Sequence, residues 1–168
     1  MKKFLKSIFQ FFITIYLFES RLGLGESRRK GISFVFVKSL KGTKANRALR
    51  EYFKKNKYQL KRFTKKSNFA GLIYENEIVC SGWIYIGKNK WNIKEINKKI
   101  KLENKYMLYD FVTQKKFRNM GYYKLLLKII RKKLKRRKLL IYALSHNASA
   151  VNAIKKSGFK FKKKLKKY

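Results

Sequence analysis

Apolar residues recur along this chain with two different periods, and each period indicates a different kind of element. Short apolar runs bounded by polar or glycine residues predict β-strands. These runs cover residues 32–37, 69–74, 78–86, 106–113 and 139–144. After the fourth run, leucine and isoleucine recur three and four positions apart with lysine and arginine between them. This spacing predicts an amphipathic helix that begins near Asn119 or Gly121 and ends near Leu134.

Capping and turn residues place the remaining elements. Residues 75–77 separate two strands and predict a tight hairpin turn. Three further helices are expected: one capped by Thr43, a short one over residues 94–100, and one that Asn147 opens and Gly158 ends. A last strand is expected to begin at Phe159. The alternation of strands and helices favours an α/β domain built on a mixed sheet.

An apolar run over residues 8–18 stands near the amino end, after several lysines. Eleven residues of helix reach only about 16 Å, whereas the hydrocarbon core of a membrane is about 30 Å thick. Residues 19–22 lack the small side chains of a signal-peptide cleavage site. We therefore expect residues 1–25 to form an apolar helix that either packs on the domain or lies on an anionic membrane surface.

Length and composition indicate one folded domain. The chain has 168 residues, of which 45% are hydrophobic and 16% aromatic, a composition that disfavours disorder. No internal repeat or linker divides it. We assign residues 31–161 to the domain and residues 162–168 to a basic tail.

The net charge of +38 comes from 46 Lys and Arg residues against 8 Asp and Glu residues. Such an excess favours an anionic partner, such as RNA, a membrane surface or a phosphorylated substrate. The alternative is compositional, because abundant Lys, Asn, Ile, Phe and Tyr with no Pro is typical of an AT-rich coding sequence. The lysines are also spread along the chain instead of forming one block.

One cysteine and one histidine restrict the chemistry. Cys80 alone cannot form an internal disulfide or a cysteine-based metal cluster, and it is expected to be a packed small hydrophobe. His146 alone excludes zinc sites built from several imidazoles. No metal site is expected.

The segment from Tyr106 to Phe159 resembles the GNAT superfamily of acyl-CoA-dependent N-acyltransferases. Residues 118–123, Arg-Asn-Met-Gly-Tyr-Tyr, are similar to the Q/R-x-x-G-x-G/A pyrophosphate loop of that family. The second signature is similar to residues 147–150 followed by Lys-Ser-Gly-Phe at 156–159. Tyr123 departs from the pattern, since the family usually has a small residue there, so this side chain must point away or the loop must shift.

The resemblance implies a single-domain GNAT-like three-layer fold whose two central parallel strands splay apart around acetyl-CoA. The exposed amides of a helix N-terminus stabilise an anion such as pyrophosphate. A backbone amide near Phe111 or Val112 would hold the thioester oxygen. The residues expected to bind the cofactor are Phe111, Val112, Thr113, Lys115, Arg118, Asn119, Met120, Gly121, Tyr122, Tyr123 and Asn147.

Asp110 is the strongest candidate for binding or deprotonating the amine. An alkyl ammonium group has a pKa near 10.4 and must lose a proton before attack. Asp110 is the sole aspartate and lies in an otherwise apolar strand, where a carboxylate needs a partner or a task. A structural ion pair with a basic residue is the alternative role.

The general acid expected from the resemblance is missing. The family often has a tyrosine four residues before the Gly of the Gly-Phe pair, and Ile154 stands there in this chain. Tyr109, Tyr142, His146 or solvent could protonate the leaving thiolate instead.

We therefore predict an N-acetyltransferase that transfers an acetyl group from acetyl-CoA to a primary amine of a small molecule or amino sugar. The expected location is the cytoplasm, with contact to the inner face of the membrane as an option. The alternative function is a basic RNA- or ribosome-associated protein that keeps the fold without catalysis or acetylates protein N-termini.

Overall fold

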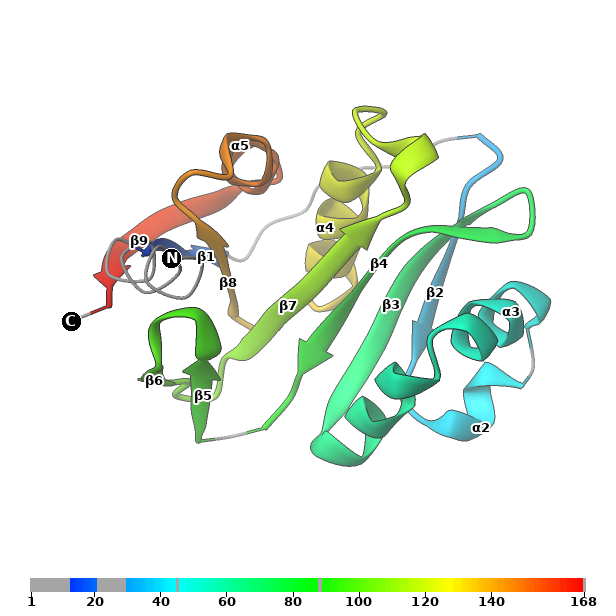
Figure 1. The fold of residues 1–168 in the computed structure, drawn as a ribbon, viewed down its shortest axis with the longest axis horizontal. Coiled ribbons are helices and arrows are strands. Elements are labelled where there is room, and N and C mark those ends of the chain that lie inside the picture. The colour runs from blue at the N-terminus through cyan, green and yellow to red at the C-terminus, as the bar shows by residue number, and fades with distance from the viewer. Residues whose placement is uncertain (1–12, 21–29, 45, 88, 168) are drawn as a thin grey trace, which may run out of the picture.

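The computed structural model describes residues 13–20, 30–44, 46–87 and 89–167 (Figure 1). Seven strands form one sheet in the order β2-β3-β4-β7-β8-β1-β9, and β5 pairs with β6 in a separate hairpin. The strands are β1 (Thr14–Ser20), β2 (Ser33–Val37), β3 (Ser67–Tyr74), β4 (Glu77–Tyr85), β5 (Lys90–Ile93), β6 (Lys98–Lys101), β7 (Tyr106–Thr113), β8 (Leu139–Leu144) and β9 (Phe159–Lys166). The helices are α2 (Leu40–Thr43), α3 (Arg47–Lys55), α4 (Tyr122–Lys133) and α5 (Ala148–Lys156), with 3₁₀ segments η1 (Lys57–Lys65), η2 (Lys94–Ile96) and η3 (Lys115–Phe117).

The sheet separates two layers of covering elements. Leu108 of β7 packs in one core with residues of α4 and α5, such as Leu126 and Ile154. Its chain neighbour Met107 packs in a second core with the β5–β6 hairpin, and α3 packs on Trp83 in a third. Successive side chains of a strand point to opposite faces. The fold is therefore a three-layer mixed α/β domain, as the sequence predicted.

The strands β7 and β8 lie at the centre of the sheet and run parallel. They pair only from Tyr106↔Leu139 to Leu108↔Ile141. Figure 1 shows them diverging toward their carboxyl ends, with α5 and the loop before α4 at the open side. The splayed central pair that the sequence predicted is confirmed.

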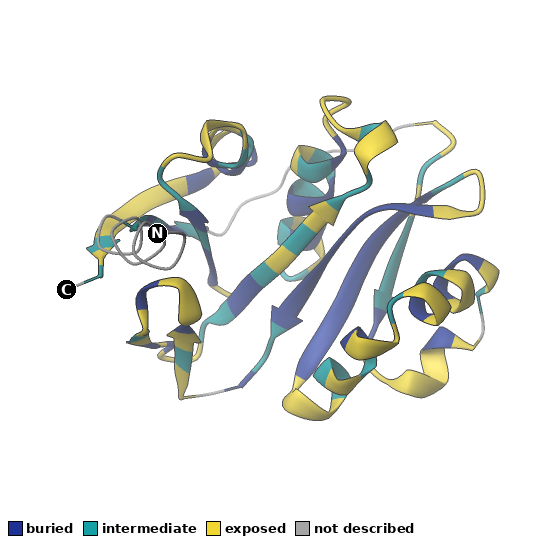
Figure 2. Cartoon of the chain, viewed as in Figure 1, coloured by how far each residue is buried: buried dark blue, intermediate teal, exposed yellow. Residues whose placement is uncertain are grey.

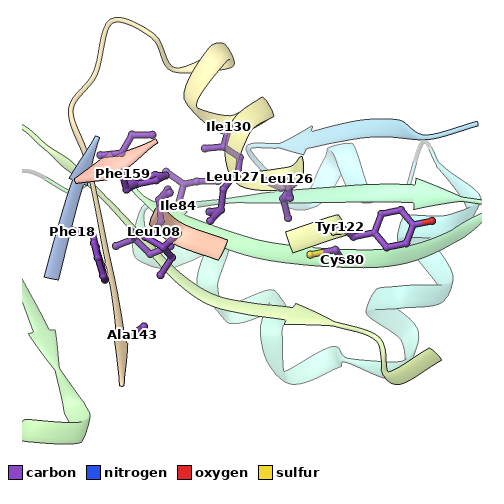
Figure 3. Packing of buried hydrophobic residues seen from close by; sticks show 14 of the residues in the cluster. Phe18, Cys80, Ile84, Leu108, Tyr122, Leu126, Leu127, Ile130, Ala143 and Phe159 are labelled. Atoms are coloured by element: carbon purple, nitrogen blue, oxygen red, sulfur yellow. The ribbon is translucent and has the colours of Figure 1, made fainter. Parts of the chain in front are cut away.

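The prediction of a helix over residues 1–25 is wrong where the structure describes this segment. Thr14–Ser20 forms β1, which lies between β8 and β9 and is antiparallel to both. Phe18 is fully buried, and Figure 3 shows it directed into the same core cluster as Leu108. The strands β8 and β9 supply its backbone partners, and its two faces are buried in separate cores, Phe18 in one and Ile15 and Leu17 in the other. This burial removes the polar alternation that identifies most strands. The remainder of residues 1–25 lies outside the described residues.

Three smaller predictions also need correction. Residues 162–166 belong to β9, the last strand of the sheet, instead of a basic tail; their pairing with β1 and the exposure seen in Figure 2 fit a solvated edge strand. Asn46, not Thr43, caps the helix α3, because its side chain accepts a hydrogen bond from the Leu49 amide at 3.2 Å. The short helix expected over residues 94–100 is instead the 3₁₀ segment η2 followed by the first residues of β6.

The caps and turns of the later half follow the sequence. Glu75 and Asn76 have left-handed backbones in the β3–β4 hairpin, and Asn147 accepts a hydrogen bond from the Ala150 amide at 3.0 Å. Gly158 has a φ of 85° just after α5. Among the described residues, no helix is both long and apolar enough to cross a membrane.

Candidate acyl-CoA and acceptor site

A cavity of about 750 Å³ lies where β7 and β8 separate. Among the described residues no pairing joins the two strands beyond Leu108 and Ile141, although β7 continues to Thr113 and β8 to Leu144. Residues of both strands and of the first turns of α4 and α5 line the cavity. A volume of this size is typical of small-molecule and cofactor sites.

A β-bulge in β7 forms one edge of the cavity. Trp83 of β4 pairs with Tyr109 and Ser81 pairs with Val112, so two residues of β7 lie opposite the single Gly82. Asp110 takes up the extra residue with a left-handed φ of 50°. The next side chain, the ring of Phe111, lies over Gly82, where a Cβ atom would collide with it. The bulge therefore depends on a glycine in the neighbouring strand.

The bulge decides which amides face the cavity. The Tyr106 amide donates to Lys138 O on the β8 side at 3.0 Å, whereas the Gln114 amide donates to Val79 O on the β4 side at 3.0 Å. Backbone amides of a regular strand point alternately to its two sides, so the amides of Tyr106 and Gln114 would point to the same side. They point to opposite sides because the bulge adds one residue between them. Beyond the bulge, the amides of Phe111 and Thr113 therefore face the gap. Of the two amides predicted to hold the thioester oxygen, the geometry favours Phe111 over Val112.

The loop before α4 is shaped by two left-handed residues. Asn119 has a φ of 63° and Gly121 a φ of 78°, and Gly121 is the N-cap of α4 without a side-chain cap. Amides of the first helical turn have no acceptor within the helix, and no acidic residue stands in this turn. Apart from its own chain neighbours, no described residue would come within 4 Å of a Cβ at Gly121. This helix end is therefore open to an anion in the cavity.

Cations surround the same end of the cavity. Arg118, Lys124 and Lys156 line it, and Arg118 Nε donates to Thr113 O at 3.4 Å. The predicted cofactor residues Lys115 and Met120 do not line the cavity. The other predicted cofactor residues all do: Phe111, Val112, Thr113, Arg118, Asn119, Gly121, Tyr122, Tyr123 and Asn147.

Tyr123 points toward the sheet. Its ring centroid lies 5.5 Å from that of Phe111, and burial raises the pKa of its hydroxyl. The neighbouring Tyr122 is buried in the core and meets Phe117 edge to face. The aromatic residue that departs from the family pattern is thus held against the bulge, where it also lines the cavity.

Asp110 lies at the cavity and is already paired. Its Oδ2 is 2.6 Å from Arg62 Nη2, and its side chain is 49% exposed. The Arg62 guanidinium also lies over the rings of Trp83 and Tyr109, at 5.4 and 5.6 Å from their centroids. The sequence indicated that this carboxylate needs either a charged partner or a catalytic role. Arg62 is the charged partner, and Asp110 also lines the cavity.

Tyr142 of β8 also lines the cavity and contacts a carboxylate that the sequence did not single out. Its hydroxyl lies 3.3 and 3.4 Å from the two oxygens of Glu95 and donates to them. Burial raises the pKa of Tyr142, and the charges of Glu95 and Asp110 raise it further. His146 lies in the turn after β8, exposed and outside the cavity lining. Glu95 is distant in sequence from every motif, so only the folded hairpin places it here.

The charges that line the cavity are separated by sign. The cations Arg118, Lys124 and Lys156 stand at or beside the α4 and α5 side of the sheet. The carboxylates Glu95 and Asp110 stand on the side of η2 and η1. The gap between β7 and β8 thus joins a cationic end to an anionic end.

Comparisons with solved structures identify this fold. An acetyltransferase of the GNAT family from Novosphingobium aromaticivorans, described as putative, aligns with a TM-score of 0.57 and 11% identity over 90% of this chain and 61% of that one. A GNAT acetyltransferase from Colwellia psychrerythraea aligns with a TM-score of 0.54 and 11% identity, covering 89% and 53%. A GCN5-related N-acetyltransferase-like protein from Streptococcus suis gives 0.53 and 10%, covering 98% and 65%.

These similarities establish the fold and no more. The chain spans between about half and two thirds of the length of these three structures. By sequence, no family model and no curated protein matches it. The chain has the mixed α/β architecture of a GNAT-like acetyltransferase, at a sequence identity too low to carry over an activity.

Proposed function

We propose that this protein transfers an acetyl group from acetyl-CoA to a primary amine. One observation carries the proposal: the β7–β8 gap joins gap-facing backbone amides to an uncapped, cation-flanked helix N-terminus. A thioester attached to a diphosphate needs both features. The GNAT-like fold of the compared structures supports the same reaction class.

The residues present fit acetyl-CoA. The open space at Gly121 leaves room for a phosphate against the α4 backbone, and Arg118 and Lys124 supply charge around it. From Tyr109 to Thr113, the side of β7 that faces β8 has no strand partner and offers strand-like hydrogen bonds to an extended amide-bearing arm. Bound there, acetyl-CoA supplies an acyl group activated as a thioester.

The chain's own groups would orient and polarise this thioester. The Phe111 amide is placed to donate to the carbonyl oxygen as negative charge develops on it, a contact whose loss costs about 10²–10³ in rate at comparable sites. Asn147 holds the first turn of α5 at the cavity wall by capping it. Tyr142 lines the cavity with a hydroxyl that is protonated at neutral pH, so this group is placed to donate a proton to the leaving thiolate; the burial that raises its pKa makes it a weaker acid for that step.

Thiol release tests the transfer. The parent protein, given acetyl-CoA and a panel of primary alkylamines, is expected to release coenzyme A and yield an acetylated amine detectable by mass spectrometry. The Tyr142→Phe variant is expected to retain cofactor binding and lose about 10²–10⁴ in rate if its hydroxyl is the acid. The proposal would be contradicted if the protein released no coenzyme A with any amine in the panel.

The acceptor is proposed only as a primary amine. The amino-sugar acceptor suggested by the sequence has no support in the compared structures and stays a prediction.

The alternative of RNA binding rests on the lysines of β9, most of them exposed at the sheet edge: Lys160, Lys162, Lys163, Lys164 and Lys166. RNA binding through phosphates would weaken steeply with salt concentration, whereas acetyl-CoA binding would change modestly.

A further inference from the structure

We propose that Glu95 is the carboxylate that receives the acceptor amine as an alkylammonium ion and takes its proton. This inference rests on the proposed acetyl transfer and names the acceptor class and the receiving residue. The evidence comes from the distribution of acidic residues, from the walls around Glu95, and from its contact with Tyr142.

Most of the carboxylates that the structure describes are paired with cations. Eight acidic residues face 46 basic ones, and seven of the eight lie in the described residues. Four of these seven form ion pairs within 4 Å: Glu19, Glu77, Glu103 and Asp110. The other three are Glu51, Glu75 and Glu95. Of these three, Glu95 alone lines the cavity.

Asp110 is less suited to receive an ammonium ion, although it lines the same cavity. Its pairing with Arg62 at 2.6 Å already compensates its charge, and Arg62 is itself held against Trp83 and Tyr109. Binding an ammonium ion to Asp110 would bring a second cation beside this guanidinium. Like charges at such a site repel each other. Glu95 instead contacts the neutral hydroxyl of Tyr142, so its negative charge can attract an ammonium ion.

The surroundings of Glu95 suit an alkyl group with a cationic head. The phenol rings of Tyr109 and Tyr142 line this end of the cavity. Trp91 packs against Tyr109 in a tilted arrangement with 4.5 Å between ring centroids, which holds the β5–β6 hairpin and hence η2 against the sheet. Aromatic walls with one carboxylate attract an ammonium ion through charge and ring electrostatics.

The proton balance requires such a group. An alkylammonium ion has no lone pair, so it must pass one proton to a base before its nitrogen can bond to the thioester carbon. One proton passes to the Glu95 carboxylate, and the C–N bond forms. As the C–S bond breaks, the nitrogen loses its second proton, and the leaving thiolate takes up one proton, so the products are the amide, the thiol and protonated Glu95. Tyr142, hydrogen-bonded to Glu95, fixes the carboxylate at the gap between β7 and β8.

Binding can be measured without turnover. In the full chain labelled with [¹³Cζ]tyrosine, the resonance assigned by Tyr142→Phe is expected to shift on titration with n-butylammonium chloride and to reach saturation. Glu95→Gln is expected to raise the half-saturation concentration at least about tenfold. The matched control Glu51→Gln removes the same charge from the exposed face of α3 and is expected to leave it unchanged. A Tyr142 shift that sodium chloride produces equally, or a half-saturation concentration that Glu95→Gln leaves unchanged, would overturn the proposal.

Kinetics supply the second test. With saturating acetyl-CoA, Glu95→Gln is expected to lower kcat/KM for n-butylamine by about 10²–10⁴. For aniline, which is unprotonated at neutral pH, the loss is expected to stay below tenfold. Equal losses for both amines, or a larger loss for Asp110→Asn than for Glu95→Gln, would contradict the role. Failure of the proposed acetyl transfer is distinguishable from failure of the Glu95 proposal. In that case the parent protein would release no thiol, while its Tyr142 resonance would still report ammonium binding.

Discussion

Gly121 and Gly158 adopt the same left-handed backbone for different purposes. Their φ angles are 78° and 85°. A Cβ at Gly121 would enter open space beside the cavity, whereas a Cβ at Gly158 would collide with the guanidinium of Arg131. Arg131 Nη1 donates to the Ser157 carbonyl at 2.6 Å and so holds the end of α5 against α4. One glycine therefore leaves open space beside the cavity, and the other allows close packing.

The pair gives a matched prediction. Gly121→Ala is expected to cost about 1–2 kcal/mol of unfolding free energy, from backbone strain alone, and to weaken acetyl-CoA binding at least tenfold. Gly158→Ala is expected to cost more unfolding free energy, because strain and collision add, and to keep acetyl-CoA binding. Urea denaturation and calorimetric titration measure the two effects. Equal losses of binding in both variants would contradict the assignment of Gly121 to the cofactor.

Cys80 is a buried thiol with a suppressed reactivity. Burial raises its pKa to about 12, and the Thr113 hydroxyl donates to its sulfur at 3.3 Å. The thiolate is the reactive form, so native protein at pH 8 is expected to resist iodoacetamide, while urea-unfolded protein reacts readily. Mass spectrometry of the alkylated protein checks this. Because the folded pKa is raised, this thiol favours the folded state below its unfolded pKa and the benefit declines as pH rises toward about 12. Rapid alkylation of the native protein would refute the burial of Cys80.

At the scale of elements, the bulge in β7 is the feature on which the cavity depends. Gly82→Ala is expected to displace the Phe111 ring, turn the Phe111 amide from the gap and weaken acetyl-CoA binding. Gly71→Ala is the control, because a Cβ there would lie 3.1–3.4 Å from the side chains of Phe69, Ile78 and Val35, none of which lines the cavity. Calorimetric titration of both variants measures the effect. Unchanged binding in Gly82→Ala would show that the cavity does not require the bulge.

The strand β1 is a second element with a testable consequence. It pairs with β8 and β9, and Ser20 Oγ accepts a hydrogen bond from the Leu139 amide at 3.0 Å. Its amides are therefore expected to be protected from hydrogen exchange as strongly as those of β8. Mass-spectrometric exchange on peptides from both strands checks this. Exchange of β1 within seconds would contradict its place inside the sheet.

The sequence predicted elements well where local signals were complete. The hairpin at residues 75–77, the start of α4 at Gly121 and the Asn147 cap follow from turn and capping chemistry, and all are observed. β1 was mistaken for a helix because a strand buried on both faces has the same apolar run as a short buried helix. Its partner strands lie more than 100 residues further along the sequence, so a local sequence pattern cannot reveal the pairing.

The candidate site was predicted in part for the same reason. Residues on the loop and on α4 belong to one contiguous motif, so nearly all of them were found. The bulge at Asp110 and its pairing with Arg62 arise from η1 and β7 meeting in space. Glu95 reaches the cavity through the β5–β6 hairpin, which has no motif of its own.

At the scale of the molecule, a sheet held together by antiparallel pairs opens at its one parallel pair among the described strands. The cavity in this opening lies between a cationic helix side and an anionic hairpin side in a chain with a net charge of +38. This polarity is what a diphosphate-bearing acyl donor and an ammonium acceptor need. The central claim is therefore that acetyl-CoA binds in the gap between β7 and β8.

Thermal unfolding with acetyl-CoA tests this claim most directly. At a ligand concentration of 100 times Kd, binding adds about 2.7 kcal/mol to the unfolding free energy, which raises Tm by about 5–10 °C for a chain of this size. We predict this rise for the parent protein, a smaller rise for Arg118→Ala and none for Gly121→Glu. An unchanged Tm in the parent, or the same rise in Gly121→Glu, would contradict the account.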